Sequence, residues 1–590
     1  MRRSKVVVTI GPASESEERL RQLVEAGMDV ARFNLSHGGG EALRQRSERV
    51  RRAAEAAGRH VGLMFDTRGP EVRLGRFREG AAELVPGQSF LLVPEPVEGD
   101  RERASISYPG LGRDLEPGAT LLLDDGNLVL RVRRVRSDGS IECEVVVGGR
   151  LLSGKKCLAP GTRLSLPPLL PEDEADLRLG LELEVDFVAA SFVQTAEDVL
   201  AVRRFLEANA PAGARLPEIV TKVETRHAVD HFEEILEVSD GVMVARGDLG
   251  LEMATEEVPF AQKRIIALAN RAGKPVITAT QMLESMVVHA SPTRAEAADV
   301  ANAVLDGSDA VMLSAESATG AHPVEAVRMM ARIAERADAE LVARRRRESP
   351  SAFLPATVTE AISLASVTTA TALEAAAIIT PTQSGRTARV VAAQRPAAPV
   401  LAVTPEPATA RRLSLVWGVE PLILPAQPSS DVMVERAVGA ALEAGYIANG
   451  DLVVITAGFP VGVSGTTNTL KVHTVAVVVG RGQGIGHEAA SGPACLAADA
   501  TEAAARFRDG DVLVVPRVDG ALAALAARAA ALVVTEGGLS SPSAIVALNA
   551  GKPAIVGFQP GDGVEPLRPG ETVTVDPVHG LLYRGRVHRI

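Results

Sequence analysis

Two acidic residues, Glu224 and Asp248, each follow a short apolar run of this 590-residue chain. Two carboxylates without an adjacent histidine or cysteine suit an octahedral Mg²⁺ or Mn²⁺, which takes its remaining ligands from water and an anionic substrate. The pair therefore predicts a divalent metal site. The alternative is that each acid only caps the helix that follows it.

Lys222 lies two positions before Glu224, so in a strand both side chains point to the same face, beside the predicted metal. Only eight of the 63 basic residues are lysines, so a lysine in a buried strand is unexpected in this chain. A compact, rotatable ammonium can follow a transferring phosphoryl group or polarise a carbonyl, for which the planar guanidinium of arginine is less suited. The alternative is an ordinary ion pair with Glu224.

A second set of strand-end side chains carries oxygen atoms and only one formal charge. Such a set suits a monovalent cation better than a second divalent ion. Because Asn and Ser are also common turn residues, the pattern alone is weak. The set comprises Asn34, Ser36, Asp66 and Thr67.

Positioning these residues requires a repeated scaffold, and eight β-branched runs separated by helix-length segments supply one. Eight such units predict a (β/α)8 barrel, in which catalytic groups lie where the strands run into their following loops. The predicted strands are Val6–Ile10, Val30–Leu35, Val61–Asp66, Asp186–Phe192, Glu218–Glu224, Gly241–Gly247, Pro275–Thr280 and Ala310–Ser314.

The remaining segments predict three further domains, within an α/β protein overall. Residues 70–170 are rich in turn pairs around short strands and predict a small β-barrel lid inserted between the barrel segments 1–69 and 171–341. After a basic, proline-containing linker, alternating strands and helices predict an α/β domain at 345–474. Residues 475–590 form a third pattern of mixed strands and alanine-rich helices.

Composition excludes several classes of partner. The net charge of −11 argues against a general affinity for nucleic acid or anionic membranes. There is no apolar run of about 18 residues that could span a bilayer. The start of the chain lacks the pattern of an export signal, which predicts a cytoplasmic location. The widely spaced Cys143, Cys157 and Cys495 suit neither a disulfide framework nor a Cys-x-x-Cys metal site.

The segments that carry these residues resemble pyruvate kinase, in order and across essentially the whole chain. The resemblance implies transfer of the phosphoryl group of phosphoenolpyruvate to ADP in glycolysis, with Mg²⁺ (or Mn²⁺) and K⁺ as cofactors, in a homotetramer. Residues 475–590 resemble the extra C-terminal domain of some bacterial members. The matching segments include KVVVTIGPASES, GMDVARFNLSHG, FDTRGPEVR, LDDG, TKVE, MVARGDLG, ITATQMLESM and WGVEP.

The same resemblance implies a role for individual residues. Lys222 would stabilise the phosphoryl group in flight and the pyruvate enolate, Arg32 would contact the phosphate, and Thr280 would lie beside the enolate methylene. Gly247 and Asp248 would complete the substrate site, and Glu71 implies a requirement for K⁺. Glu224 and Asp248 would bind Mg²⁺, Asn34, Ser36, Asp66 and Thr67 would bind K⁺, and Asn34, His37, Arg73 and Lys155 would face the nucleotide.

A hydroxyl-rich loop in the second α/β domain precedes a helix start, where backbone N–H groups and the helix dipole favour a phosphate. The resemblance implies an allosteric site there for a sugar phosphate or nucleotide monophosphate, aided by residues 460–466. The alternative is an ordinary capped helix. The residues are Thr382, Ser384, Gly385, Arg386 and Thr387.

The terminal loop 536–544 resembles the loop of phosphohistidine swivelling domains, but Pro542 stands at the histidine position. A phosphohistidine carrier is therefore not predicted.

Two other functions stay open. A regulatory paralogue without turnover is suggested by the lid segment Cys157-Leu158-Ala159, where many members of the family have Gly-Val-Asn. A barrel lyase that forms a metal enolate would share Glu224 and Asp248, but it would have no use for the lid or the monovalent-cation set.

Overall fold

The computed structural model describes the chain except residues 1, 37–38, 348–356, 459–466, 562–563 and 588–590. The described chain divides into two compact units. The first unit comprises Met1–Ser351, Ser384–Ala397 and Glu406–Ile423, and the second comprises Ala352–Gln383, Ala398–Pro405 and Leu424–Ile590.

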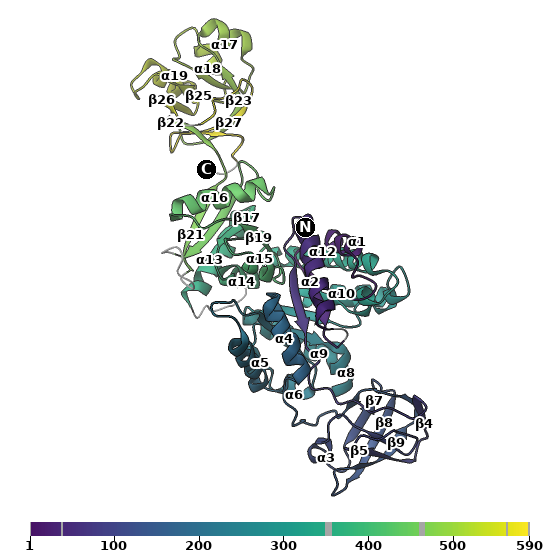
Figure 1. Ribbon diagram of the computed structural model, residues 1–590. Helices are drawn as coiled ribbons and strands as arrows, with labels where there is room; N and C mark the ends of the chain where they lie inside the picture. Colours follow the sequence, from purple (N-terminus) through teal and green to yellow (C-terminus); the bar gives the residue numbers. More distant parts are fainter. Residues whose placement is uncertain (1, 37–38, 348–356, 459–466, 562–563, 588–590) are drawn as a thin grey trace. The chain divides into compact units, whose positions relative to one another are not determined.

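Eight parallel strands close into a barrel in the first unit, with the order β1-β16-β15-β14-β13-β12-β3-β2 (Figure 1). The predicted (β/α)8 barrel is confirmed. Every predicted strand is present, with ends shifted by a few residues at most. The strands are β1 (Lys5–Thr9), β2 (Val30–Asn34), β3 (Gly62–Asp66), β12 (Phe187–Ala190), β13 (Glu218–Val223), β14 (Gly241–Ala245), β15 (Val276–Ala279) and β16 (Ala310–Leu313).

The barrel is packed on both faces of its strands, which explains why the strand sequences are nearly continuous apolar runs. Side chains such as Val7, Phe187 and Met243 fill the interior, while others such as Phe65 and Val244 pack against the surrounding helices. The main surrounding helices are α1 (Glu17–Ala26), α2 (Glu41–Ala56), α4 (Pro171–Glu182), α5 (Ala196–Asn209), α7 (Phe232–Val238), α9 (Val258–Arg271), α10 (Arg294–Asp306) and α12 (Pro323–Arg347).

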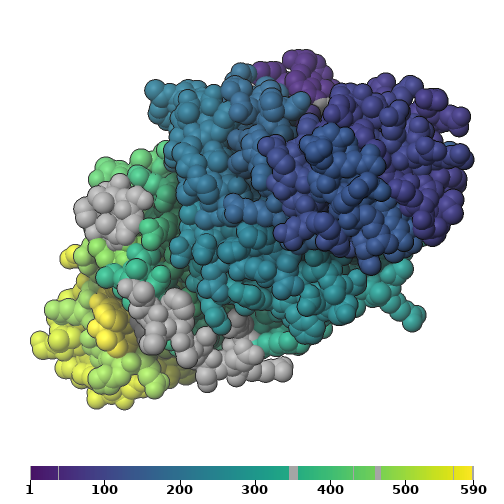
Figure 2. Space-filling view, turned by 90° about the horizontal axis from the view of Figure 1, so that it is seen from below, coloured from purple at the N-terminus to yellow at the C-terminus, as the bar shows by residue number. Residues whose placement is uncertain are grey.

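The segment inserted after β3 has its own core and forms a rounded lobe, coloured dark blue in Figure 2. A six-stranded sheet with the order β11-β7-β8-β9-β5-β6 shares this core with the antiparallel pair β10-β4. The strands are β4 (Ala81–Leu84), β5 (Ser89–Val93), β6 (Arg103–Ser105), β7 (Thr120–Leu123), β8 (Leu128–Val135), β9 (Ile141–Val147), β10 (Gly149–Leu152) and β11 (Cys157–Leu158).

The three cysteines, two of which lie in this lobe, are expected to resist thiol reagents. Burial raises the pKa of Cys143 and of Cys157 to about 12, and Cys495 is buried as well. At pH 8 the thiolate fraction of the first two is therefore about 10⁻⁴. We expect Ellman's reagent to label none of the three cysteines in the native protein and all three in guanidinium chloride. Labelling of one thiol before unfolding would contradict this.

Two later segments belong to the same unit as the barrel: Ser384–Ala397, which contains α14 (Arg386–Ala393), and Glu406–Ile423, which contains α15 (Pro407–Leu413). Ion pairs fix both of them. Arg389 binds Glu218 at 2.7 Å, and Arg411 binds the buried Asp186 at 2.9 Å.

The C-terminal part contains two further sheets. A five-stranded sheet has the order β19-β18-β17-β20-β21, and a second closed barrel has the order β22-β26-β25-β24-β23-β27-β28. The predicted C-terminal α/β domain and extra terminal domain are thus confirmed as folds. The strands of the first sheet are β17 (Ala377–Pro381), β18 (Val400–Thr404), β19 (Val419–Ile423), β20 (Leu452–Gly458) and β21 (Thr467–Thr474).

The terminal barrel contains the loop in which a swivelling domain would carry its histidine. Here Pro542 is the first residue of α19 (Pro542–Ala550), and Ser541 caps that helix. The strands are β22 (Val478–Ile485), β23 (Ala490–Leu496), β24 (Val512–Val515), β25 (Ala531–Val534), β26 (Ala554–Pro560), β27 (Thr572–Asp576) and β28 (Leu581–Arg584).

Among the described residues, no helix combines the length and the apolar character needed to cross a membrane.

Candidate active site

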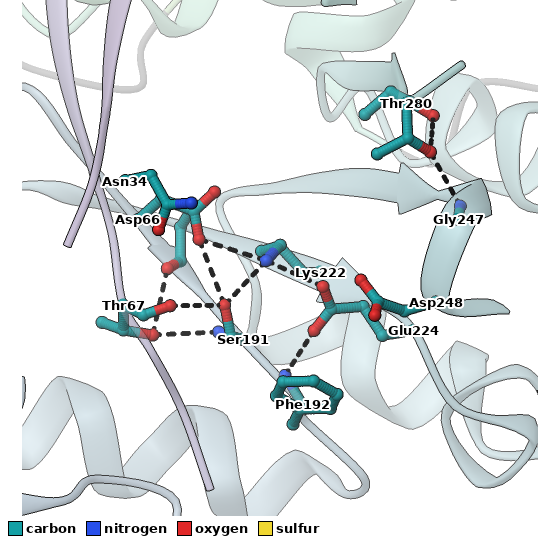
Figure 3. Close-up of polar contacts among 12 residues, drawn as sticks. Asn34, Asp66, Thr67, Ser191, Phe192, Lys222, Glu224, Gly247, Asp248 and Thr280 are labelled. Atoms are coloured by element: carbon teal, nitrogen blue, oxygen red, sulfur yellow. Dashed lines mark hydrogen bonds and ion pairs between the residues drawn. The ribbon is translucent and has the colours of Figure 1, made fainter. Parts of the chain in front are cut away.

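Lys222 lies at the centre of a buried polar cluster at the carboxyl ends of the barrel strands (Figure 3). Its Nζ atom lies 2.7 Å from Glu224 Oε1 and 3.1 Å from Asp66 Oδ1. It also donates a hydrogen bond of 2.8 Å to Ser191 Oγ. Burial alone would lower the pKa of Lys222, but Asp66 and Glu224 raise it well above its ordinary value. The ammonium therefore stays charged inside the barrel mouth.

Asp66, at the end of β3, is shared between two cations. Its Oδ2 atom accepts a 2.5 Å hydrogen bond from Arg32 Nε, while its Oδ1 atom faces Lys222. Burial would raise the pKa of Asp66, yet Arg32 and Lys222 together hold it below the usual value. Arg32 is oriented further by a hydrogen bond of 2.8 Å to Thr9 Oγ1. The cluster therefore keeps two positive groups close together, as an anionic substrate requires.

Glu224 has properties that suit a metal ligand. Its Oε2 atom accepts a hydrogen bond of 2.6 Å from the backbone N–H of Phe192. Its buried Oε1 atom contacts the Lys222 ammonium as an ion pair. Burial raises the pKa of Glu224, Lys222 opposes the rise, and the nearby Asp248 adds to it. Lys222 therefore neutralises Oε1, and an ionised carboxylate keeps further lone pairs that a metal cation could share.

Asp248 lies in α8 (Arg246–Glu252), close to Glu224 in the close-up (Figure 3). Within the described part of the chain, no group of three or more His, Cys, Asp or Glu side chains could hold a metal ion. Two carboxylates fit Mg²⁺, which keeps several waters and takes other ligands from substrate, better than a metal that needs a closed protein shell. The residues therefore fit a divalent ion that binds together with an anionic substrate.

The lid contributes Lys156 to this site, a residue that sequence reasoning left without a role. Its Nζ atom lies 2.6 Å from Glu71 Oε1 and 3.5 Å from Asp248 Oδ1. Burial would lower the pKa of Lys156, but Asp248 and Glu71 raise it above the usual value. Lys155, the predicted residue, instead binds Asp124 within the lid at 2.6 Å.

The lid segment Cys157-Leu158-Ala159 supplies packing. Cys157 and Ala159 are buried in the core of the lobe. The contacts with the barrel come from its neighbours, namely Lys156 and the backbone N–H of Gly161, which donates to Glu252 at 3.3 Å. The unusual residues therefore leave these lid contacts intact.

The predicted monovalent-cation set is partly assembled around Ser191. The Ser191 hydroxyl donates a hydrogen bond of 2.7 Å to the Thr67 carbonyl and lies 3.1 Å from Asp66 Oδ1. The Ser191 backbone N–H donates a hydrogen bond of 3.0 Å to Thr67 Oγ1. Asn34 Oδ1 accepts from the Ser36 N–H at 3.1 Å. No local sequence pattern marks Ser191 as the link between Lys222 and this set.

Thr280 follows β15 and is held close to Gly247. Its Oγ1 atom accepts a hydrogen bond of 2.7 Å from the Gly247 N–H and donates 2.6 Å to the Ala279 carbonyl. Thr280 has a φ of 66° and Gln281 a φ of 52°, which are uncommon values for residues other than glycine.

Other predicted residues are less informative. Arg73 is exposed and binds Glu71, while His37 and the loop 460–466 lie outside the described residues. Four of the five predicted effector residues, Ser384 to Thr387, lie at the start of α14, where Gly385 has a φ of 83°. Thr382 follows β17 and donates its N–H to the Val403 carbonyl at 2.8 Å.

Comparison with known proteins assigns this combination of fold and site to a family. Residues 1–327 match the model of the pyruvate kinase barrel domain, and residues 360–473 match that of the pyruvate kinase alpha/beta domain. Residues 507–580 match the mobile domain of PEP-utilising enzymes.

Whole-chain relatives agree with the family models. A pyruvate kinase of Bacillus licheniformis is 46% identical over 587 residues, and one of Geobacillus stearothermophilus is 45% identical over 590 residues; each match covers 99% of both chains. The crystal structure of a pyruvate kinase from Cryptosporidium parvum superposes with a TM-score of 0.76 at 37% identity, covering 80% of this chain and 96% of that one. The chain therefore belongs to the pyruvate kinase family, whose members are phosphotransferases.

Proposed function

We propose that this chain transfers the phosphoryl group of phosphoenolpyruvate to ADP at the mouth of its (β/α)8 barrel, giving pyruvate and ATP in glycolysis, in the cytoplasm. The observation that carries the proposal is the charged Lys222 between the buried carboxylates of Asp66 and Glu224. Phosphoryl transfer depends mainly on positioning and on neutralising charge on the phosphoryl oxygens.

Lys222 and Arg32 supply the fixed positive charge. As the phosphoryl group leaves the enol oxygen, negative charge develops on that oxygen and persists on the transferring group. Lys222 has a rotatable ammonium that serves both centres. Arg32 is held by Asp66 and Thr9 and orients the phosphate.

Glu224 and Asp248 would hold Mg²⁺ or Mn²⁺, which supplies charge neutralisation to the enolpyruvate and phosphate oxygens. Asn34, Ser36, Asp66 and Thr67 would hold K⁺. With Asp66 already paired to Arg32 and Lys222, the other three residues would contribute neutral oxygens.

Thr280 would act next to the enolate methylene. Its hydroxyl accepts from the Gly247 N–H, so it is oriented by the same helix start that carries Asp248. In this position it lies in the route by which the methylene carbon gains its proton and becomes the methyl group of pyruvate.

The lid would exclude water from the transferring group, because water would hydrolyse it. Lys156, rather than Lys155, would carry positive charge from the lid to the nucleotide phosphates, since it faces Asp248. Arg73 and His37 would lie on the nucleotide side as well.

We further propose control by a sugar phosphate or nucleotide monophosphate at the start of α14, involving Thr382, Ser384, Gly385, Arg386 and Thr387, in a homotetramer. The left-handed Gly385 ahead of the helix supports a phosphate-binding turn. Thermal-shift screening of these two ligand classes tests it, and an unchanged melting temperature with every ligand of both classes would argue against it.

The catalytic proposal is tested by coupling pyruvate formation to lactate dehydrogenase. We expect NADH oxidation that requires phosphoenolpyruvate, ADP, Mg²⁺ and K⁺ together. Binding of phosphoenolpyruvate without turnover would favour a regulatory paralogue, and pyruvate formation independent of ADP would favour a lyase; either result would overturn the proposal.

The two lid lysines form a matched pair of variants. Replacing Lys156 by methionine is expected to raise the KM for ADP about tenfold or more, because the ammonium that faces Asp248 is lost. Lys155→Met removes the same group from the ion pair with Asp124 and should leave the KM for ADP within about twofold of the wild type. Equal effects of the two substitutions, measured by steady-state kinetics, would reject the assignment of Lys156.

A further inference from the structure

Two consecutive non-glycine residues in the loop after β15 adopt left-handed backbone conformations. Thr280 has a φ of 66° and Gln281 a φ of 52°. For a β-branched residue such as threonine this region is a genuine outlier, and it persists only where the surroundings hold it. Keeping this loop in one conformation therefore costs folding free energy.

Arg246 holds the backbone of this loop. The residue follows β14, and its side chain is 11% exposed. Its guanidinium donates to three successive carbonyl oxygens of the loop. The distances are 3.3 Å to Ala279, 2.8 Å to Thr280 and 3.3 Å to Gln281.

The guanidinium is itself fixed from the other side by Asp299. The Arg246 Nη1 atom lies 2.7 Å from Asp299 Oδ2, on helix α10. The planar fork of an arginine can bind a carboxylate on one edge and carbonyl oxygens on the other, which a lysine ammonium cannot do at the same distances. Because arginine is common in this chain, its presence at position 246 does not by itself indicate a special role. The evidence for that role is the set of three contacts with backbone carbonyls.

The Thr280 side chain is held by the residue next to Arg246. The Gly247 N–H donates 2.7 Å to Thr280 Oγ1, and a Cβ atom at Gly247 would lie 3.4 Å from that oxygen. The junction of β14 and α8 thus fixes both the backbone and the hydroxyl of Thr280. Farther along the loop, the buried Glu316 accepts from the Leu283 N–H at 3.1 Å.

We infer that Arg246 is a positioning residue that holds Thr280 in its left-handed conformation and so places the Thr280 hydroxyl at the reacting centre. The inference rests on the proposed role of Thr280 beside the enolate methylene. The residue acts through backbone carbonyls, and it is not itself a catalytic group.

The test uses the ability of glycine to adopt a left-handed backbone conformation without steric cost. Arg246→Met is expected to lower kcat about 10- to 100-fold, because a small displacement of a reacting group has an effect of that size. The KM for phosphoenolpyruvate should change less than about threefold. Glycine at position 281 adopts the left-handed region without a clamp, and the Gln281 side chain is exposed. Adding Gln281→Gly should therefore restore about tenfold of the lost kcat.

Glu184→Gly is the matched control for the second substitution. Glu184 is also exposed and left-handed, with a φ of 50°, but it lies between α4 and β12. Adding it to Arg246→Met should restore no activity. Circular dichroism and the melting temperature of each variant report separately on folding.

Arg246→Lys keeps a positive charge beside Asp299 without the fork, so it should fold and show the same loss and rescue. An unchanged kcat in Arg246→Met, or a lost kcat that Gln281→Gly does not restore, would overturn the inference. The inference would also be overturned if both Arg246 variants misfold and Gln281→Gly does not restore folding. The contacts of Arg246 with the loop carbonyls would then serve folding and not the positioning of Thr280. Thr280→Val tests the underlying role separately: if it keeps the wild-type kcat, the assignment of Thr280 fails whatever the Arg246 variants do.

Discussion

Lys222→Met is expected to lower kcat about a thousandfold or more, the largest effect of any single substitution considered. The variant removes the ammonium that would neutralise the transferring phosphoryl group and the enolate. It also leaves Asp66 and Glu224 without the cation that lies 3.1 Å and 2.7 Å from them. Steady-state kinetics in the coupled assay measures the loss.

Since removing one partner of a buried ion pair also destabilises the fold, the kinetic loss must be separated from unfolding. Lys222→Arg retains the charge and should fold, but its planar fork cannot replace the compact ammonium, so it too should be nearly inactive. Lys263→Met, at an exposed lysine paired with Asp306, is the matched control and should keep the wild-type kcat. Substantial turnover in a folded Lys222→Met would refute the assignment of Lys222.

Asp248→Asn is expected to impair catalysis through the divalent metal. Removing one of two carboxylates should weaken Mn²⁺ binding at least about tenfold and lower kcat/KM in parallel. Electron paramagnetic resonance of free Mn²⁺ measures the affinity without reference to activity. Glu224→Gln should behave alike, because it removes the other of the two carboxylate charges that would hold the ion.

Glu252→Gln provides the control for Asp248. Glu252 lies on the same helix, but its carboxylate accepts from the lid backbone at Gly161. Its substitution should leave the Mn²⁺ affinity within about threefold of the wild type. Equal Mn²⁺ affinity in Asp248→Asn and the wild type would exclude Asp248 as a ligand.

The barrel and the strand-end residues could be predicted because both depend on local periodicity. Buried parallel strands are short apolar runs, and the residue after each run lies at the mouth of the barrel. Lys222 and Glu224 could be placed on one face by the two-residue period of a strand. Their ion pair, which was the alternative to a catalytic role for Lys222, is present as well.

The contacts that join distant segments could not be predicted. Lys155 and Lys156 are adjacent and identical in type, and only the folded lid shows which of them faces Asp248. Asp66 was predicted as a K⁺ ligand, and its partner Lys222 lies 156 positions farther along the chain. The strand pattern places both residues at the barrel mouth, but it does not predict their ion pair.

Backbone strain was also invisible in the sequence. Thr280 and Gln281 have the composition of an ordinary polar loop, and nothing in their residue types signals a left-handed conformation. The clamp that holds them is made by Arg246, one of many arginines in the chain, through carbonyl oxygens that every residue possesses. Such a device becomes apparent only from atomic positions.

The proposed reaction at this barrel mouth moves a phosphoryl group from phosphoenolpyruvate to ADP. Phosphorus NMR of the full-length protein with both substrates, Mg²⁺ and K⁺ follows that group directly. We expect the γ-phosphate resonance of ATP to replace the phosphoenolpyruvate resonance with the wild-type protein, and Lys222→Met to show almost none of this change. Persistence of phosphoenolpyruvate with the wild-type protein, or its conversion to inorganic phosphate without ATP, would show that this chain does not transfer the phosphoryl group to ADP.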